Sequence, residues 1–190
     1  RRGFQGVLCD WEEPPTAFLK ELLGELERQL ADRGLQLYVP EEYAFCTKKA
    51  GLLVSSALCG GSLELRLKEG LERFGSDRLV LALQRSAEDF QLPAPESRGR
   101  ILKEEELKQM LRERQPGVFF SRELCARYFT YVDRRGQPHF VLFDDGDTMA
   151  RKVEVGRRAG VRCFAAVWPE ICDAADRMGL QTVRTGPGRR

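Results

Sequence analysis

The stretch GVLCDWE, residues 6–12, decides the expected fold. It begins as a short apolar run, typical of a buried strand, and ends on two acids. Side chains alternate across a strand, so Leu8, Asp10 and Glu12 share one face, while Cys9 and Trp11 share the other. Acids at the carboxyl end of a parallel strand lie where α/β enzymes keep their active sites, and two close carboxyls let one act as a proton donor. The alternative is a pair of solvated acids, or acids near the dipole of the next helix.

Strands and helices alternate downstream of this stretch. Thr16 can cap a helix in which leucines recur every three or four residues, and Gly34 ends it. A second helix follows Ser62 and ends at Gly75. Further strands are predicted at residues 35–39, 52–58 and 78–84. This alternation predicts parallel strands with helices packed outside.

The rhythm changes after residue 90. Residues 91–100 hold two prolines and predict a loop, and residues 102–114 predict a short charged helix. Residues 128–132 and 139–143 flank a Gly-containing turn and predict a β-hairpin. Thr148 can cap a helix at 149–159 that Gly160 ends, with Asp144, Asp145 and Asp147 as cap and first-turn acids. A last strand at 161–168 and a helix at 169–178 follow, so the helix and hairpin are an insertion before the last strand.

Composition bounds the function classes. The net charge is +2 with acids and bases interspersed, so we expect no nucleic-acid partner. No apolar run reaches the roughly 20 residues of a membrane helix, so we expect no membrane partner. The six scattered cysteines form no C-x-x-C pair; we expect no metal site, and they slightly favour a reducing, cytoplasmic compartment, as does the lack of an apolar leader in this chain. We expect one domain over residues 1–180 and a disordered tail at 181–190.

The stretch from Gln5 to Glu12 resembles the D-G-x-D-x-D-x-E motif on the fourth barrel strand of the family 18 glycoside hydrolases. The Gly, the last Asp and the Glu match, while Gln5 and Leu8 replace the first two Asp. The resemblance implies that Glu12 protonates the glycosidic oxygen. It implies that Asp10 orients the substrate's N-acetyl group, whose oxygen is the nucleophile. No cofactor is implied.

A second stretch is also similar to this family. The hairpin strand His139–Phe143, the helix with Lys152, Gly160 and a strand ending in Trp168 resemble the segments before the family's barrel closure. The resemblance implies that the Trp168 indole forms the floor of a sugar-binding subsite. Without the resemblance, Trp168 is equally well interpreted as an aromatic residue of the core. Gln84 and Tyr38 are further substrate-binding candidates on predicted strands, and Arg85, next to Gln84, is a weaker one.

One departure and one consequence follow from the resemblance. The family carries M-x-Y-D on its sixth strand, yet no Tyr or Asp stands between Tyr43 and Asp77. The chain would form the C-terminal portion of a (β/α)8 TIM barrel, strands four to eight, and we expect the sequence to be truncated. A half barrel on its own would favour a dimer, and a five-stranded open α/β sheet is the structural alternative.

The expected function is a bacterial hydrolase acting on N-acetylglucosamine-containing β-1,4 glycans, chitin- or peptidoglycan-like. The alternatives are a glycan-binding or scaffold protein of the same fold.

Overall fold

The computed structural model describes residues 4–11, 13–93 and 99–180 in two compact units. The first unit comprises the described residues up to Leu83 together with Val155–Ala165. The second comprises the described residues from Gln84 to Glu154 and from Ala166 onward. The expected tail at 181–190 and the acid Glu12 lie outside the described residues. The expectation of one domain over residues 1–180 stays a prediction.

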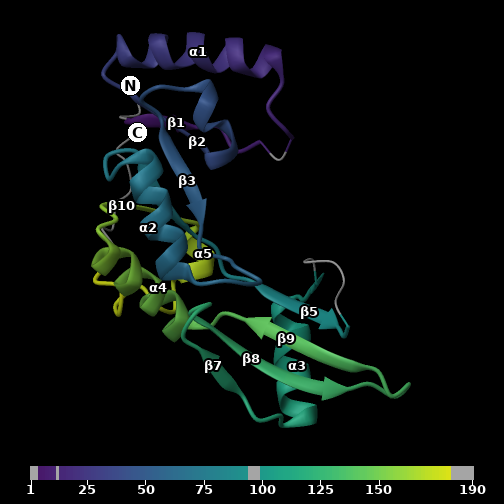
Figure 1. Ribbon diagram of the computed structural model, residues 1–190. Coiled ribbons are helices and arrows are strands. Elements are labelled where there is room, and N and C mark those ends of the chain that lie inside the picture. The colour runs from purple at the N-terminus through teal and green to yellow at the C-terminus, as the bar shows by residue number, and fades with distance from the viewer. Residues whose placement is uncertain (1–3, 12, 94–98, 181–190) are drawn as a thin grey trace, which may run out of the picture. The chain divides into compact units, whose positions relative to one another are not determined.

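The first unit is built on a curled parallel sheet (Figure 1). Hydrogen-bonded neighbours follow the order β1-β2-β3-β4-β10, and each of the pairs β1–β2, β2–β3 and β3–β4 is parallel. The strands are β1 (Gly6–Leu8), β2 (Gln36–Pro40), β3 (Gly51–Ser55), β4 (Leu79–Leu83) and β10 (Cys163–Ala166). Strand order therefore follows chain order, with the whole insertion lying between β4 and β10.

Two helices of the first unit begin and end where the sequence predicts. In α1 (Ala17–Ala31) the Thr16 hydroxyl accepts the Leu19 N–H at 3.2 Å. In α2 (Leu63–Phe74) the Ser62 hydroxyl accepts the Leu65 N–H at 3.4 Å, and Gly75 follows with a φ of 79°. Both caps satisfy backbone donors that a helix start leaves without an intrahelical partner. The 3₁₀ helix η1 (Glu41–Cys46), between β2 and β3, was not predicted.

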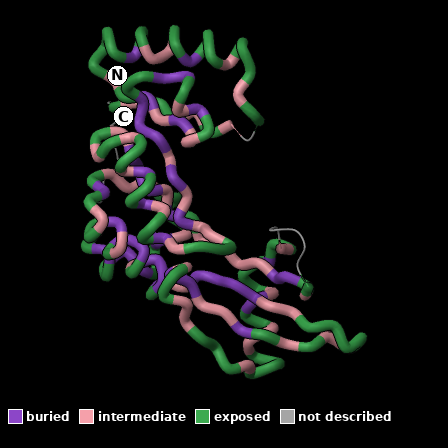
Figure 2. Tube along the Cα trace, viewed as in Figure 1, coloured by how far each residue is buried: buried purple, intermediate pink, exposed green. Residues whose placement is uncertain are grey.

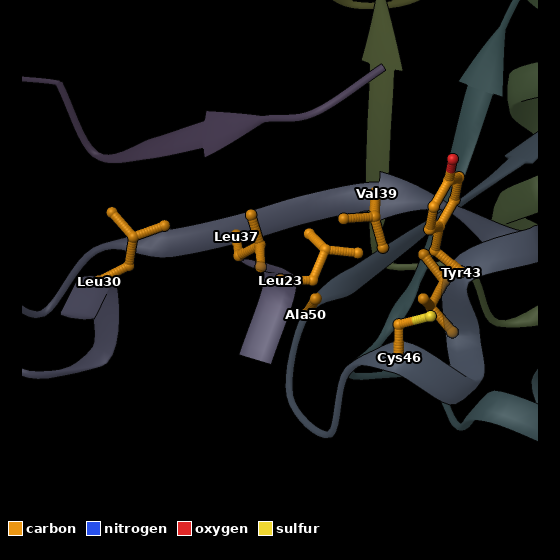
Figure 3. Packing of buried hydrophobic residues seen from close by; sticks show 8 residues of the cluster. Leu23, Leu30, Leu37, Val39, Tyr43, Cys46 and Ala50 are labelled. Atoms are coloured by element: carbon orange, nitrogen blue, oxygen red, sulfur yellow. The ribbon is translucent and has the colours of Figure 1, made fainter. Parts of the chain in front are cut away.

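The helices cover one face of the sheet, which we call the outer face. Leu37 and Val39 of β2 pack with Leu23 of α1 in one buried cluster (Figure 3). Helix α2 approaches β4 so closely that a Cβ on Gly70 would lie 2.7 Å from Leu79 Cδ1. Helix α4 (Gly146–Ala159) reaches the same face through Gly156, which meets Leu81. The prediction of parallel strands with helices outside is confirmed.

The opposite, inner face of this sheet carries a different set of side chains. Strand alternation places Leu8 there, because Cys9 packs with the outer cluster. Tyr38 lies against Gly51, whose added Cβ would stand 2.6 Å from the ring and 3.1 Å from Val80. Leu8 is 53% exposed, so β1 is not the buried strand that its composition predicts. The physical reason is its place at the end of the strand order, where no further strand is described to cover it.

The second unit is larger than the predicted helix and hairpin. It holds a five-stranded antiparallel sheet in the order β6-β5-β9-β8-β7 (Figure 1). The strands are β5 (Ala87–Gln91), β6 (Arg100–Ile101), β7 (Phe119–Ser121), β8 (Ala126–Val132) and β9 (Pro138–Phe143). The predicted hairpin is β8–β9, and three short strands were missed. The predicted loop at 91–100 is wrong at both ends, which pair into the sheet; its residues 94–98 lie outside the described part.

One face of this antiparallel sheet packs against α3 (Glu104–Arg114). Leu107 of α3 forms a buried cluster with Phe129, Val141 and Phe143 from the strands, which appears as buried stretches along β8 and β9 in Figure 2. Met110 and Leu111, three and four residues after Leu107, pack against the same cluster, so one side of α3 covers these strands.

The last elements are shorter than predicted. Strand β10 spans Cys163–Ala166 instead of 161–168, and helix α5 spans Trp168–Ile171 instead of 169–178. Turns follow α5 up to Gly179, and Ala174, Ala175 and Met178 remain buried in them. These residues are spaced three or four apart, as in an amphipathic helix, because consecutive turns also bury one side of the chain. The sequence pattern alone therefore predicted a longer helix. Helix α4 begins at Gly146 rather than at residue 149.

No described helix is both long and apolar enough to cross a membrane.

Candidate functional site

Asp10 lies just beyond the carboxyl end of β1. Pairing with β2 continues through Cys9, whose N–H donates to the Tyr38 carbonyl at 2.9 Å, and Asp10 is exposed after it. Burial raises the pKa of the Cys9 thiol, in keeping with its place on the outer face. Asp10 therefore stands at the carboxyl edge of a parallel sheet with its side chain in solvent, as the strand pattern predicts.

Tyr43 contacts the residues on both sides of Glu12. The Trp11 and Tyr43 rings lie 5.6 Å apart at 59°, and the Tyr43 hydroxyl donates to the Glu13 carbonyl at 2.5 Å. Tyr43 is 1% exposed, and burial raises the pKa of its hydroxyl, which keeps the group a donor. The segment that carries Glu12 is thus tied to η1 at its two flanking residues. Glu12 itself lies outside the described residues.

Tyr38 occupies the inner face one strand away from β1. Its register partners are Leu8 on β1 and Gly51 on β3. The glycine is required there, because any side chain at position 51 would collide with the Tyr38 ring. Asp10 lies two residues beyond Leu8, so Tyr38 sits one layer below the edge that carries the acid.

Strand β3 offers apolar and small groups on the inner face. Leu53 and Ser55 lie on it, and the Ser55 hydroxyl accepts the Ala57 N–H at 3.1 Å. No tyrosine or aspartate is present in β3 or in the turn that follows. The inner face of β3 therefore offers a hydroxyl and hydrocarbon, and no phenol or carboxylate.

Residues that follow β4 and β10 in the chain form a polar clamp within the second unit. The Arg85 backbone N–H donates to Glu170 Oε2 at 3.1 Å, and Arg85 Nη2 donates to Asp173 Oδ1 at 2.6 Å. Trp168 begins α5 and its side chain is 48% exposed, while Gln84 is also exposed. The structure therefore brings Gln84, Arg85 and the helix of Trp168 together at adjacent strand ends.

Asp144 forms a buried polar centre at the start of α4. Its Oδ2 accepts the Lys152 ammonium at 2.7 Å and both donors of Ser86 at 3.1 Å, and its Oδ1 accepts the Thr148 hydroxyl at 2.9 Å. Lys152 is 1% exposed and Asp144 is 5% exposed. These contacts satisfy both oxygens, so this carboxylate is structural.

The neighbouring acids cap α4. Asp145 Oδ1 accepts the Thr148 N–H at 2.9 Å, and the Thr148 hydroxyl accepts the Asp145 N–H at 3.0 Å, a reciprocal capping box. Asp147 pairs with Arg127 and Arg177. The prediction that Asp144, Asp145 and Asp147 serve the helix start is confirmed, although Asp145 rather than Thr148 is the N-cap. Within the described residues no cluster of acids, histidines or cysteines is placed to hold a metal ion.

His139 belongs to a hydrogen-bonded cluster on β5, β8 and β9. Its Nδ1 lies 2.8 Å from Asp89 Oδ1, while the Tyr131 hydroxyl donates to Asp89 Oδ2 at 2.7 Å. The Tyr131 and His139 rings stack at 4.6 Å. Burial and the bond to Asp89 raise the pKa of Tyr131 to about 12. No serine or cysteine contact to this pair is described, so the cluster fastens the hairpin, as a strand residue would.

The sequence singled out some of these residues and missed others. Asp10 lies where expected, and Gln84 and Trp168 lie at strand ends that the structure joins. Tyr43, Glu170 and Asp173 were missed, since their contacts depend on residues 30 to 88 positions away. The roles that the resemblance implies for Asp10, Glu12 and Trp168 stay predictions.

No family model and no curated protein matches this sequence. Solved structures do match. The spore cortex-lytic enzyme SleL of Bacillus megaterium aligns with a TM-score of 0.67 at 14% identity, over 92% of this chain and 49% of that chain. A chitinase of Chromobacterium violaceum aligns with a TM-score of 0.67 at 14% identity, over 94% of this chain and 67% of that one. A class V chitinase of Nicotiana tobaccum aligns with a TM-score of 0.62 at 15% identity, over 94% of this chain and 69% of that one.

These likenesses establish the fold. The chain folds as the C-terminal portion of a chitinase-like (β/α)8 barrel with an antiparallel insertion before the last strand. It spans about half the length of the SleL enzymes that it matches.

Proposed function

We propose that this chain is part of a glycoside hydrolase that cleaves β-1,4 bonds next to N-acetylglucosamine, in chitin-like or peptidoglycan-like glycans. The observation that carries the proposal is Asp10 at the carboxyl edge of a parallel sheet whose fold is that of chitinases and a spore cortex-lytic enzyme. One of those chitinases, from tobacco, was solved in complex with NAG4.

The proposed mechanism uses two acids of one segment. Glu12 donates a proton to the glycosidic oxygen as the bond to the sugar breaks, and the substrate's own N-acetyl oxygen attacks the anomeric carbon. Asp10 orients that N-acetyl group and stabilises the positive charge that develops on it. Tyr43 supports this role, because it fastens Trp11 and Glu13 on either side of the acid.

Binding would fall to residues at the strand ends. Trp168, half exposed at the start of α5, would stack against a pyranose ring, and Gln84 would bond to sugar hydroxyls. Tyr38, on the inner face below Asp10, would line the floor beside the acid.

A second candidate is a barrel that binds such glycans without cleaving them. It is favoured by β3, where Leu53 and Ser55 occupy the inner face and no Tyr or Asp follows up to Gly61. An N-acetyl group that no tyrosine or aspartate of β3 polarises is a weaker nucleophile, so binding would survive where turnover does not.

The test uses the full-length gene product and a chromogenic N-acetylglucosamine oligomer. Glu12→Gln keeps the shape and removes the acid, and general acid catalysis contributes about 10²–10⁴-fold in rate. We expect it to abolish most turnover and to leave glycan binding nearly intact. Asp10→Asn should reduce turnover less than Glu12→Gln, because it loses orientation and charge but no proton transfer.

Two outcomes would change the conclusion. Wild-type protein that binds chitin oligomers or peptidoglycan without turning them over would replace the hydrolase with the binding protein. Turnover that survives Glu12→Gln would overturn the assignment of the acid.

A further inference from the structure

Helix α5 is a short support for an aromatic platform. It spans only Trp168–Ile171, and its first residue is the half-exposed Trp168. Four residues cannot form a stable helix by themselves, since nucleation costs more than one turn of hydrogen bonds returns. The orientation of the indole therefore depends on contacts made by the rest of the segment.

Buried apolar residues hold the underside of this segment. Ile171, Ala174 and Met178 are at most 5% exposed. Apolar packing resists lifting of the segment but is non-directional, so it leaves rotation and sliding of α5 less constrained. Directional polar contacts are what restrict those motions.

Arg85 supplies two such contacts from the neighbouring strand end. Its backbone N–H holds Glu170 at 3.1 Å, and its guanidinium holds Asp173 at 2.6 Å, so one residue grips the segment at two points. The Arg85 side chain is 25% exposed and the Asp173 side chain 49% exposed, so this ion pair is partly shielded from solvent. A second arginine, Arg177, ties the same segment to Asp147 and also donates to the Asp173 carbonyl within the segment.

We propose that Arg85 is a positioning residue, which acts through Glu170 and Asp173 to fix the indole of Trp168 for stacking against a sugar ring. The proposal rests on the proposed function for the role of Trp168. It adds that the rigidity of the sugar platform is set from the end of β4, more than 80 residues earlier in the chain. A preordered platform binds more tightly, because less freedom is lost when the sugar arrives.

The geometry also predicts which substitution rescues the contact. Arg85 Nε is buried and has no hydrogen-bond partner among the described residues, so only the terminal nitrogen serves the ion pair. Lysine retains a cation for Asp173 and removes the unsatisfied donor. Arg85→Lys should therefore preserve the position of Trp168, whereas Arg85→Met, of similar length, should release it.

The first experiment observes Trp168 directly in the full-length protein. Fluorotryptophan labelling gives each tryptophan its own fluorine NMR signal, and Trp168→Phe identifies the one of interest. We expect Arg85→Met to shift and broaden this signal, and Arg85→Lys to leave it near its wild-type position. Asp173→Asn, which weakens the same contact from the other side, should resemble Arg85→Met. Arg162→Met is the matched control, since Arg162 forms an exposed pair with Asp77 at the start of β10.

The second experiment measures affinity for an N-acetylglucosamine oligomer by calorimetry. Fixing one side chain is worth about 0.5–1.5 kcal/mol, so Arg85→Met should bind roughly two- to tenfold more weakly than wild type. Arg162→Met should bind as wild type does. If Trp168→Ala binds the oligomer normally, the sugar-stacking role in the proposed function fails, whatever Arg85 does. If Trp168→Ala loses affinity while Arg85→Met and Asp173→Asn leave both the affinity and the fluorine signal unchanged, the positioning role of Arg85 is wrong.

Discussion

At the scale of single residues, the buried pair of Lys152 and Asp144 joins three elements. Lys152 lies on α4, Asp144 follows β9, and Ser86 precedes β5; all three meet at one carboxylate. A buried ion pair adds little net stability compared with apolar residues of similar size. Removing one member, however, leaves the other charge buried without its partner. The contribution of the pair to the free energy of unfolding is therefore measured by substituting one member.

Lys152→Met should destabilise the protein strongly. Methionine fills a similar volume but leaves the Asp144 carboxylate with hydroxyl and amide donors only, at a cost of about 3–5 kcal/mol. Urea unfolding at neutral pH measures the loss. Lys68→Met is the control, because Lys68 pairs with Glu64 at 57% exposure, and it should change stability by less than about 1 kcal/mol. Equal effects of the two substitutions would contradict the structural role of the pair.

Glu27 makes a pH-dependent contribution. Its burial opposes ionisation, yet backbone N–H groups of Lys48, Lys49 and Ala50 donate to it and together hold the pKa of its carboxyl below the usual range. A lowered folded pKa stabilises the protein above the ordinary pKa of about 4.3, and that stabilisation is lost as pH falls through the lower folded value.

Glu27→Gln should therefore lower the free energy of unfolding at pH 7 by about 1–2 kcal/mol. The difference from wild type should shrink in acid, where wild-type Glu27 is itself protonated. Thermal unfolding of both proteins from pH 7 down to about pH 3 measures this, with the pH range set by the ordinary Glu pKa. A difference that stays constant over that range would show that Glu27 acts through packing and not through charge.

At the scale of elements, glycines set how closely the helices approach the sheet. Gly70 on α2 and Gly24 on α1 both lie inside helices, where glycine costs about 0.5–1 kcal/mol relative to alanine. A Cβ on Gly70 would stand 2.7 Å from Leu79 Cδ1, whereas a Cβ on Gly24 would meet nothing within 4 Å. Glycine therefore allows the close approach of α2 to β4, whereas in α1 it only lowers the stability of the helix.

The two alanine substitutions should change the free energy of unfolding in opposite directions. Gly24→Ala should raise stability by about 0.5–1 kcal/mol through better helix propensity. Gly70→Ala should lower it, because overpacking costs about 1–3 kcal/mol and outweighs the propensity gain. Chemical denaturation of both variants checks the contrast. A stabilising Gly70→Ala would mean that α2 can move away from β4 without cost.

At the scale of the whole molecule, the parallel sheet has two terminal strands among the described residues. β1 and β10 are the terminal strands of the order, and the apolar side chains of Phe4, Val7 and Leu8 near β1 are 73%, 38% and 53% exposed. A sheet edge with exposed apolar side chains pairs readily with another chain.

A polypeptide of these 190 residues should therefore self-associate as its concentration rises. Leu8→Lys places a charge at the edge and should reduce this association, which sedimentation velocity measures. Leu65→Lys is the control, since Leu65 is 56% exposed and lies on helix α2 instead of on a strand. If both lysines, or neither, reduce association, β1 is not the surface responsible.

Local patterns in the sequence were enough to predict the capped helices and the parallel strands of the first unit. The capping residues Thr16 and Ser62, the stopping glycine Gly75 and the alternation of strands with helices are each written within a few residues. Such signals act over one turn or one strand, so they survive without knowledge of the rest of the chain. The same holds for the place of Asp10 at the carboxyl end of its strand.

The tertiary structure decided the strand pairings, exposures and side-chain contacts that depend on residues far apart in the sequence. β5, β6 and β7 have weak local signals, and each forms by pairing with a strand elsewhere in the sheet: β5 with β9, β7 with β8, and β6 with β5. The exposure of β1 follows from its position in the sheet and not from its apolar composition. The clamp of Arg85 on Glu170 and Asp173, and the hold of Tyr43 on the segment around Glu12, join residues about 30 to 90 positions apart. Propensity and periodicity are properties of neighbours in sequence, whereas hydrogen bonds and packing across that distance exist only once the chain has folded.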